Sequence, residues 1–246
     1  MRSRSSLRLF VLVSVVGLIA AACSSDDPSA SASGNGNANC TPAESPIVTV
    51  TAYSNVYDVY GKLISTFQSD WKESHNDQQV QFSTSFGGST TQAQNVVAGF
   101  PADVAALSLF PDIQLIEDAG LITHDPKQDP EGGIVATSAV VFDVRPGNPL
   151  NIDNWDDLAK PGVEILTPDP ASSGGARWNI VAAYGAAMRG EVPGYAANDR
   201  AAAQQLLTDI FSNVTVMDKS ANDSIKNFQA GNGDVAITYE LSLIHI

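Results

Sequence analysis

Pro168-Asp169-Pro170-Ala171-Ser172-Ser173-Gly174-Gly175-Ala176-Arg177-Trp178 follows a short apolar run, Val163 to Leu166, and opens a pattern with helical spacing. We interpret it as the end of a strand, a tight turn and the start of a helix over 175–189. The first amides of a helix have no intrahelical acceptor, and the helix dipole adds partial positive charge there. Glycine lets a ligand approach the backbone closely. The stretch therefore predicts a turn that binds an anion.

A second turn of the same kind lies earlier in the chain. A predicted strand over 80–85 is followed by Phe86-Gly87-Gly88-Ser89-Thr90-Thr91 and then by a helix over 90–98. A single Gly-Gly-Ser turn is a weak signal. Two such turns in one chain predict an oxyanion held between them.

Capping is the alternative explanation for the serines at these boundaries. Ser54, Ser89 and Ser173 all stand where serine commonly accepts a hydrogen bond from a helix N–H. Each serine taken singly is explained equally well by capping. Three similar boundaries together with two Gly-Gly turns favour the anion site. We expect Arg177 to brace its turn by bonding carbonyls rather than to contact the ligand.

Strands and helices alternate along the chain. The predicted strands are 47–52, 80–85, 103–107, 135–144, 163–166, 214–217 and 235–239, and the predicted helices are 56–71, 90–98, 112–119, 175–189, 198–212 and 223–230. The residues expected to share one face of the helix over 175–189 are Trp178, Val181, Ala182, Tyr184 and Met188. Such alternation predicts parallel α/β sheets with ligand sites at the carboxyl ends of the strands.

The N-terminal segment has the pattern of a secretory signal peptide. Three arginines precede an apolar run from Leu9 to Ala22, which is too short to be a membrane-spanning helix. Ala20-Ala21-Ala22-Cys23 resembles a bacterial lipobox, so we expect Cys23 to be the lipidated first residue of the mature chain. Ordinary cleavage nearby, with Cys23 unmodified, is the alternative.

The segment after Cys23 predicts a flexible tether. Residues 24–45 contain no Val, Ile, Leu or aromatic residue and are rich in Ser, Gly, Asn and Ala. Such a segment buries too little apolar surface to offset the cost of ordering it. If Cys23 is lipidated, Cys40 has no partner, so we expect no internal disulfide framework.

The charge of the chain excludes two classes of partner. The formal net charge is −14, and removal of Arg2, Arg4 and Arg8 with the signal peptide leaves 10 basic and 27 acidic residues, a net charge of −17. Binding to nucleic acid and to anionic lipid both depend on Lys and Arg. An acidic protein still binds an anion through local backbone dipoles, because salt screens carboxylates farther than about 10 Å.

Enzyme chemistry has little support in the sequence. His75, His124 and His245 lack the spacing of metal ligands, and no Gly-x-Ser-x-Gly nucleophile motif occurs. The acid pair Asp156-Asp157 follows Trp155 at a predicted helix start, where acids ordinarily complement the dipole. We therefore expect no catalytic residue, no metal and no cofactor.

The C-terminal hexapeptide Leu241-Ser242-Leu243-Ile244-His245-Ile246 is unusual. One reading frame of a common sequencing adapter encodes the same residues, so we expect an assembly artefact that cuts the natural protein after Glu240. A genuine short terminal strand is the alternative.

Several phrases of the chain resemble the solute-binding component of bacterial ABC-type sulfate importers. In order, they are Gly87-Gly88-Ser89, Gly147-Asn148-Pro149, Trp155-Asp156-Asp157-Leu158, Lys160-Pro161-Gly162-Val163, Thr167-Pro168-Asp169-Pro170, Ser172 to Asn179 and Gly233-Asp234-Val235. The phrase Thr167–Asn179 is the most specific of them.

The resemblance implies a type II periplasmic-binding-protein fold, with two parallel-sheet lobes joined by crossing strands. Together with the N-terminal patterns described above, it divides the chain into a signal peptide (1–22), a disordered tether (23–45), the first segment of lobe I (46–137), lobe II (138–238) and a return crossing with the suspect tail (239–246). Family members continue well past the position of Glu240, so the resemblance also implies that the first lobe is incomplete.

The resemblance also implies a set of anion ligands. Carried over position by position, they are Ser54, Ser89, Ser173, Gly174, Gly175, Ala221 and Tyr239. Ser54 replaces an aspartate whose backbone N–H is the donor, so serine is compatible. Tyr239 replaces a tryptophan whose indole N–H is the donor. Tyrosine also donates a hydrogen bond but with a different reach, so Tyr239 leaves the choice of anion open.

The expected protein is an extracytoplasmic, lipid-anchored, monomeric receptor that captures sulfate or thiosulfate and delivers it to an ABC permease. Membrane attachment is expected only through the lipid anchor, and no nucleic acid is expected as a partner. A receptor for molybdate, tungstate or another oxyanion is the first alternative, and an exported hydrolase is the second. Phosphate is disfavoured because its protonated form needs an acceptor, which the matched motifs do not supply.

Overall fold

The computed structural model describes residues 45–128 and 130–243. The strands are β1 (Ile47–Tyr53), β2 (Gln81–Gly87), β3 (Val104–Ala106), β4 (Val140–Val144), β5 (Ile165–Pro168), β6 (Val214–Asp218) and β7 (Val235–Tyr239). The helices are α1 (Tyr57–Ser74), α2 (Ser89–Val97), α3 (Phe110–Asp118), α4 (Gly174–Met188), α5 (Arg200–Ser212), α6 (Ala221–Gln229) and α7 (Glu240–Leu243). The predicted signal peptide, Cys23, Cys40 and His245 lie outside the described residues.

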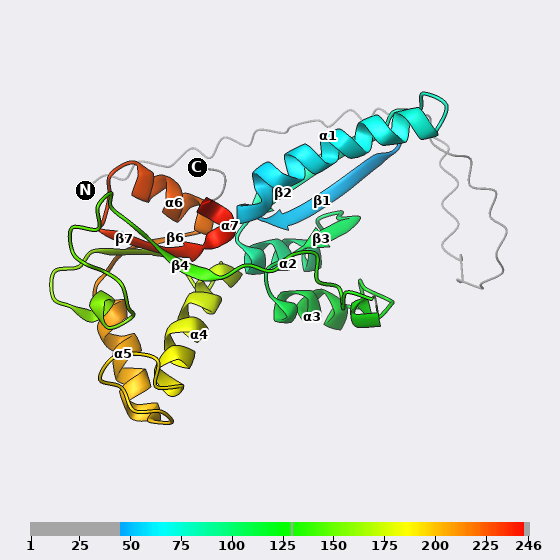
Figure 1. The fold of residues 1–246 in the computed structure, drawn as a ribbon. Helices are drawn as coiled ribbons and strands as arrows, with labels where there is room; N and C mark the ends of the chain where they lie inside the picture. Colours follow the sequence, from blue (N-terminus) through cyan, green and yellow to red (C-terminus); the bar gives the residue numbers. More distant parts are fainter. Residues whose placement is uncertain (1–44, 129, 244–246) are drawn as a thin grey trace, which may run out of the picture. The chain divides into compact units, whose positions relative to one another are not determined.

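The first sheet is parallel throughout and has the strand order β2-β1-β3. Its central strand β1 buries Val50 and Ala52, which pack with Val56 and with aromatic side chains that include Tyr60. Helix α1 lies along one face of this sheet, while α2 and α3 lie together beside β3 (Figure 1). The carboxyl ends of all three strands consequently lead into the starts of helices.

The second sheet has the order β4-β7-β5-β6. Strands β5, β6 and β7 are parallel, whereas β4 runs antiparallel to β7, with Val140 opposite Tyr239. The direction of β4 departs from the expectation of purely parallel sheets. The reason lies in the path of the chain. Strand β4 brings the chain from the first sheet into the second, and β7 leads it back toward the first sheet, against whose core Leu241 packs. Two passes in opposite directions pair antiparallel at the sheet edge.

The main hydrophobic core packs against the second sheet. Helices α4 and α5 lie side by side and both contribute residues to this core (Figure 1). The residues of α4 that are buried are Gly174, Gly175, Ala176, Asn179, Ala183, Ala186 and Ala187. Trp178 and Val181, two residues of the face expected from the helical spacing, are 44% and 55% exposed. The buried residues of α4 are mostly small, and small side chains let α4 approach α5 and the sheet closely.

Two other boundaries differ from the expected ones. The strand expected over 135–144 covers only Val140–Val144, and Val135 is 83% exposed. Of the hexapeptide for which a short terminal strand was the alternative, the described residues Leu241–Leu243 lie in a helical turn, Glu240–Leu243, and not in a strand. Among residues 45–128 and 130–243, no helix combines the length and apolar character that a membrane crossing requires.

Candidate functional site

Three helix N-termini meet at Gly88, the residue that precedes α2. A Cβ atom at Gly88 would lie 2.4 Å from the carbonyl oxygen of Ser172, in the turn before α4. It would also lie 2.8 Å from the carbonyl oxygen of Lys219, in the turn before α6. Both distances are too short for any side chain, so glycine is required for the close approach of the three turns. The amide of Thr91 in α2 also donates to the carbonyl of Ser172 at 3.2 Å.

The turn before α4 is held by its own aspartate. The carbonyl of Asp169 accepts from the amides of Ser172 at 3.1 Å and Ser173 at 2.8 Å. Its carboxylate accepts from the amide of Ala171 at 2.8 Å. The turn is joined to β6 by the amide of Asp169, which donates to the carbonyl of Asp218 at 2.7 Å. The geometry of the Ser-Ser-Gly-Gly segment is therefore set by the backbone around it.

Ser173, Gly174 and Gly175 begin α4 and are all buried. Ser173 occupies the N-cap position in an extended conformation, but its side chain makes no capping hydrogen bond. Capping therefore does not account for its hydroxyl. The amides at the start of α4 have no intrahelical acceptor, so they are available to an anion at the positive end of the helix.

Asn179 fixes the position of α4 relative to the second sheet. This buried side chain donates to Thr167 Oγ1 of β5 and to the carbonyl of Ile237 in β7, both at 3.0 Å. Two strands thereby set where the helix N-terminus points.

A buried carboxylate organises the start of α2. Asp112 of α3, 2% exposed, accepts from the hydroxyls of Ser89 at 2.6 Å and Thr90 at 3.0 Å. The Ser89 oxygen in turn accepts from the amide of Ser108 at 3.0 Å. The single hydroxyl hydrogen of Ser89 is thus directed at Asp112. In this arrangement only the backbone amide of Ser89, at the first position of α2, is left for an anion.

Arg177 links the two parts of the site. Its Nε donates to the carbonyl of Pro170 at 2.9 Å, and its Nη1 lies 3.7 Å from Asp112 Oδ1. It therefore bonds one carbonyl of its own turn, as expected. It also pairs with a carboxylate of the first half, which was not expected. Asp112 was missed because Pro111-Asp112 has the local pattern of a helix start and carries no sign of its distant partners.

Ser54 and Ala221 lie where the first strand ends and α6 begins. Ser54 is 6% exposed, and its hydroxyl oxygen accepts from the amide of Asn222 at 3.3 Å. The amide of Asp223 is satisfied by Ser220, which caps α6 at 3.3 Å. The amide of buried Ala221, the first of α6, has no acceptor within its own helix.

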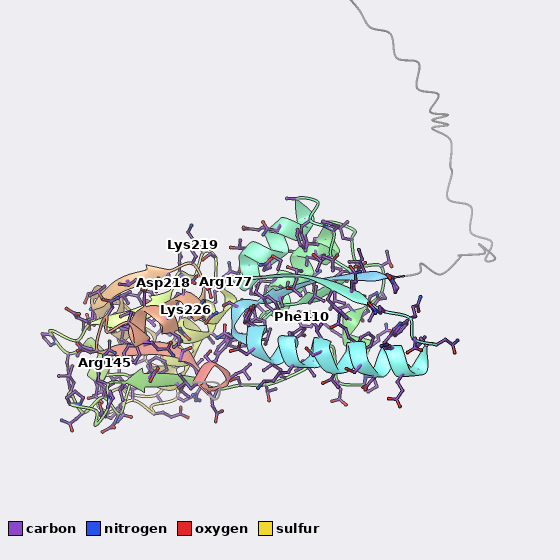
Figure 2. All side chains as sticks on the ribbon, turned by 90° about the horizontal axis from the view of Figure 1, so that it is seen from above. Phe110, Arg145, Arg177, Asp218, Lys219 and Lys226 are labelled. Carbon is purple, nitrogen blue, oxygen red and sulfur yellow. The ribbon has the colours of Figure 1, made fainter. Side chains whose placement is uncertain are left out.

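Arg145 anchors the other end of α6, away from Arg177 and Lys219 (Figure 2). Its guanidinium donates to the carbonyls of Phe228 at 2.8 Å and Gly233 at 2.9 Å and stacks over the Phe228 ring at 3.8 Å. A cation on the terminal carbonyls of a helix complements its dipole. The arrangement fixes the axis of α6 and hence the position of its N-terminus.

Tyr239 ends β7 beside the start of α4. It is 8% exposed, and its hydroxyl would lie 3.5 Å from a Cβ atom at Gly175. Burial raises the pKa of Tyr239, an effect that the adjacent Ser108 hydroxyl opposes only in part. The phenol therefore keeps its hydrogen at physiological pH and remains a potential donor.

The buried carboxylate beside these helix starts is already occupied by hydrogen-bond donors. Both carboxylate oxygens of Asp112 are taken by hydroxyl donors, so Asp112 offers no free acceptor to a ligand. Within residues 45–128 and 130–243, no group of His, Cys, Asp and Glu side chains is arranged to hold a metal ion. A concavity of about 780 Å³ lies elsewhere, against α1 and β2, and includes none of the three helix N-termini.

The chain is similar to known solute-binding proteins. The profile of the family described as bacterial extracellular solute-binding protein matches residues 48–245. A sulfate-binding protein of Synechococcus elongatus is 38% identical over 242 residues, which is 98% of this chain and 65% of that protein. A sulfate-binding protein of Escherichia coli is 40% identical over 191 residues, covering 77% of this chain and 56% of its own length.

Two further similarities complete the comparison. A thiosulfate-binding protein of Pseudomonas aeruginosa is 32% identical over 201 residues, covering 80% of this chain and 58% of that protein. The solved structure of the sulfate-binding protein SubI from Mycobacterium tuberculosis superimposes with a TM-score of 0.73 at 35% identity, over 81% of this chain and 67% of that one. The chain thus spans less than two thirds of the length of these curated relatives.

Proposed function

Because the chain belongs to the bacterial extracellular solute-binding proteins, we propose that it is an extracytoplasmic receptor that captures sulfate and delivers it to the permease of an ABC importer. The fold is that of the bilobed periplasmic binding proteins. We assign residues 46–137 to lobe I, 138–238 to lobe II and 239–246 to the return crossing.

The observation that carries the proposal is the meeting of three helix N-termini at Gly88. Each helix end adds unpaired amides and partial positive charge at the same place. Sulfate at neutral pH has two charges and no proton, so its ideal site offers donors only. Backbone amides supply such donors without burying a full positive charge, which needs a partner to be tolerated.

The proposed ligand groups come from both halves of the molecule. We assign Ser54, Ser89, Ala221 and Tyr239, together with the Ser173-Gly174-Gly175 turn, to the site. The hydrogen bond of Ser89 to Asp112 supports a role for its amide in the arrangement seen here. If the Ser89 hydroxyl contacts sulfate, it must first leave Asp112.

Closure of the two halves would follow from contacts that the ligand makes with both. The bond between Thr91 and Ser172 and the pair of Asp112 with Arg177 already join them. A ligand that bridges α2, α4 and α6 binds the closed arrangement better and shifts the population toward it.

We further propose that Cys23 is lipidated and that the tether over 23–45 holds the receptor at the outer face of the membrane as a monomer. The support is the basic and apolar start of the chain followed by Ala20-Ala21-Ala22-Cys23. Neither a nucleic acid nor a cofactor has a place in this proposal.

Thiosulfate is the second candidate ligand. It differs from sulfate by one terminal sulfur in place of an oxygen, and the Tyr239 hydroxyl donates at a different distance from the indole N–H that it replaces. Molybdate and tungstate have the same charge as sulfate and a larger radius, so the same donors would meet them at longer distances. An exported hydrolase is disfavoured because the family is defined by solute binding.

Calorimetric titration tests the proposal. The mature protein expressed from the complete gene, freed of bound anion, would be titrated with sulfate, thiosulfate, molybdate and phosphate. We expect one saturable site for sulfate and no measurable heat with phosphate. Binding of phosphate in preference to sulfate would refute a donor-only site. Turnover of a sulfate or phosphate ester would favour the hydrolase.

A further inference from the structure

Two hydroxyl groups that lie beside the start of α4 make no hydrogen bond of normal geometry to any group in residues 45–128 and 130–243, although they lie close enough together for the Ser108 hydroxyl to lower the pKa of Tyr239. They belong to Ser108, which follows β3, and to Tyr239, the last residue of β7. Both oxygen atoms are buried. A buried polar group without a partner is costly, so each such group in a folded protein calls for an explanation, of which an absent ligand is one.

The backbone amide and carbonyl of Ser108 both make hydrogen bonds, so only its hydroxyl remains to interact with a ligand. Its amide donates to Ser89 Oγ at 3.0 Å, and its carbonyl accepts from Trp178 Nε1 at 3.1 Å. These bonds hold Ser108 between the start of α2 and the first turns of α4. The position of its Oγ is therefore set by the site and not by a flexible loop.

Both hydroxyls lie against glycines of the first turn of α4. A Cβ atom at Gly174 would lie 2.3 Å from Ser108 Oγ, and one at Gly175 would lie 3.5 Å from the Tyr239 hydroxyl. Unpaired amides at this helix end point toward an anion. The two side chains consequently flank the place where the ligand is held.

We propose that Ser108 and Tyr239 act as a hydroxyl pair in which Ser108 donates to the Tyr239 oxygen and thereby directs the Tyr239 hydrogen to the bound anion. The inference rests on the proposed function and names two side chains that determine the selectivity of that site. Two hydroxyls carry two hydrogens, so one bond between them leaves a single hydrogen for the ligand. A phenol oxygen accepts while it donates, whereas an indole N–H only donates. Ser108 is thus a positioning residue that acts through Tyr239.

Four variants test the pair: Ser108→Ala, Tyr239→Phe, the double variant and Thr238→Val as a control. Thr238 also has a buried hydroxyl without a described partner, but it points to the opposite face of β7 from Tyr239. Sulfate affinity is measured by calorimetry on the protein from the complete gene, and the melting temperature is measured without ligand.

We expect Tyr239→Phe to weaken sulfate binding at least tenfold, roughly the loss for one hydrogen bond to a charged group. Ser108→Ala should weaken it about threefold to fivefold, roughly the effect of a neutral hydrogen bond. The double variant should bind no more weakly than Tyr239→Phe, because Ser108 has no effect once the phenol is absent. The melting temperature without ligand should change little in all of them, since each substitution removes at most the one hydrogen bond between the two hydroxyls.

If the losses of sulfate affinity in the two single variants add up in the double variant, Ser108 does not act through Tyr239 and the proposal is refuted. Unchanged sulfate affinity in Tyr239→Phe would also refute it. A loss in Thr238→Val equal to that in Ser108→Ala would also overturn it. If the unaltered protein does not bind sulfate, the proposed function fails by itself. In that case the same variants, titrated with thiosulfate and molybdate, test whether Ser108 acts through Tyr239. An unaltered protein that binds none of the three anions would refute both the proposed function and the hydroxyl pair.

Discussion

Replacement of Gly174 by alanine should weaken sulfate binding without unfolding the protein. The new Cβ would lie 2.3 Å from Ser108 Oγ and 3.0 Å from Leu109 Cγ and from Ser89 Cβ. These three neighbours belong to the first half of the chain, whereas Gly174 begins a helix of the second. The steric conflict therefore arises only where the two halves are in contact.

The size of the effect follows from those distances. A contact of 2.3 Å is too short to persist, so Ser108 or α4 must shift. Overpacking by one methyl group costs about 1–3 kcal/mol. If that cost falls on the closed, liganded arrangement, it raises the dissociation constant for sulfate about 5- to 150-fold.

Gly185→Ala is the matched control, because Gly185 lies in the same helix. Its Cβ would meet only the Arg189 side chain, with Nη1 at 3.0 Å, and this exposed side chain can shift at the surface together with Glu191, its ion-pair partner. Alanine inside a helix is more favourable than glycine by about 0.5–1 kcal/mol, so the control should be slightly more stable and should bind sulfate normally.

The assay combines calorimetric titration with thermal unfolding in the absence of ligand. We expect Gly174→Ala to show a raised dissociation constant and a melting temperature close to that of the unaltered protein. An unchanged dissociation constant would refute the steric reasoning. A melting temperature that falls as much as the affinity would show that the contacts described between the halves persist in solution without ligand, so that the substitution acts on folding and not on binding.

Three further predictions concern the donor turn, alkaline pH and the N-terminus. Ser173→Ala should cost about 1.5–3 kcal/mol of sulfate binding in a titration, with little loss in chemical denaturation because the hydroxyl makes no capping bond; unchanged affinity would exclude it as a donor. Burial raises the pKa of Tyr53, Tyr60 and Tyr239 in the folded protein. The folded state is therefore fully stable with respect to these groups below the unfolded pKa of about 10, and it loses stability as the pH rises further, because the unfolded chain releases the phenol protons first. Melting temperatures that do not fall from about pH 9 to 11 would contradict this. Mass spectrometry of membrane-extracted protein should find a diacylglycerol adduct on Cys23, and a soluble protein that begins at another residue would disprove the anchor.

The strand–turn–helix units were predictable because their signals are local. The unit around Ser173 was expected as a strand over 163–166 and a helix over 175–189, and the structure has Ile165–Pro168 and Gly174–Met188. Apolar runs, paired glycines and helical spacing all act within a few residues. The resemblance to sulfate importers supplied the set of proposed ligand positions, which local patterns alone do not give.

The contacts between units were not predictable in the same way. The bonds of Asp112 to Ser89 and Thr90 depend on how β2 and β3 align on either side of β1. Ser108 follows the unremarkable run Ala105-Ala106-Leu107 and becomes notable only when β3, α4 and β7 are brought together.

Hydrophobic spacing predicted the helix α4 but did not indicate which of its faces is buried. Trp178 and Val181 carry the strongest apolar signal in that helix, yet both are largely exposed. The buried face is lined instead by small residues such as Ala183 and Ala187. Close helix packing selects for small volume, which a hydrophobicity pattern undervalues.

Nuclear magnetic resonance of the ¹⁵N-labelled mature protein tests most directly whether sulfate is bound by helix N-termini. The reporting signals are the backbone amides of Gly174, Gly175 and Ala221, followed while sulfate is added. The account predicts saturable downfield shifts of these three amides at one equivalent of sulfate, with no comparable shift when phosphate is added. Sulfate binding that leaves these amides unchanged and shifts resonances elsewhere would contradict it.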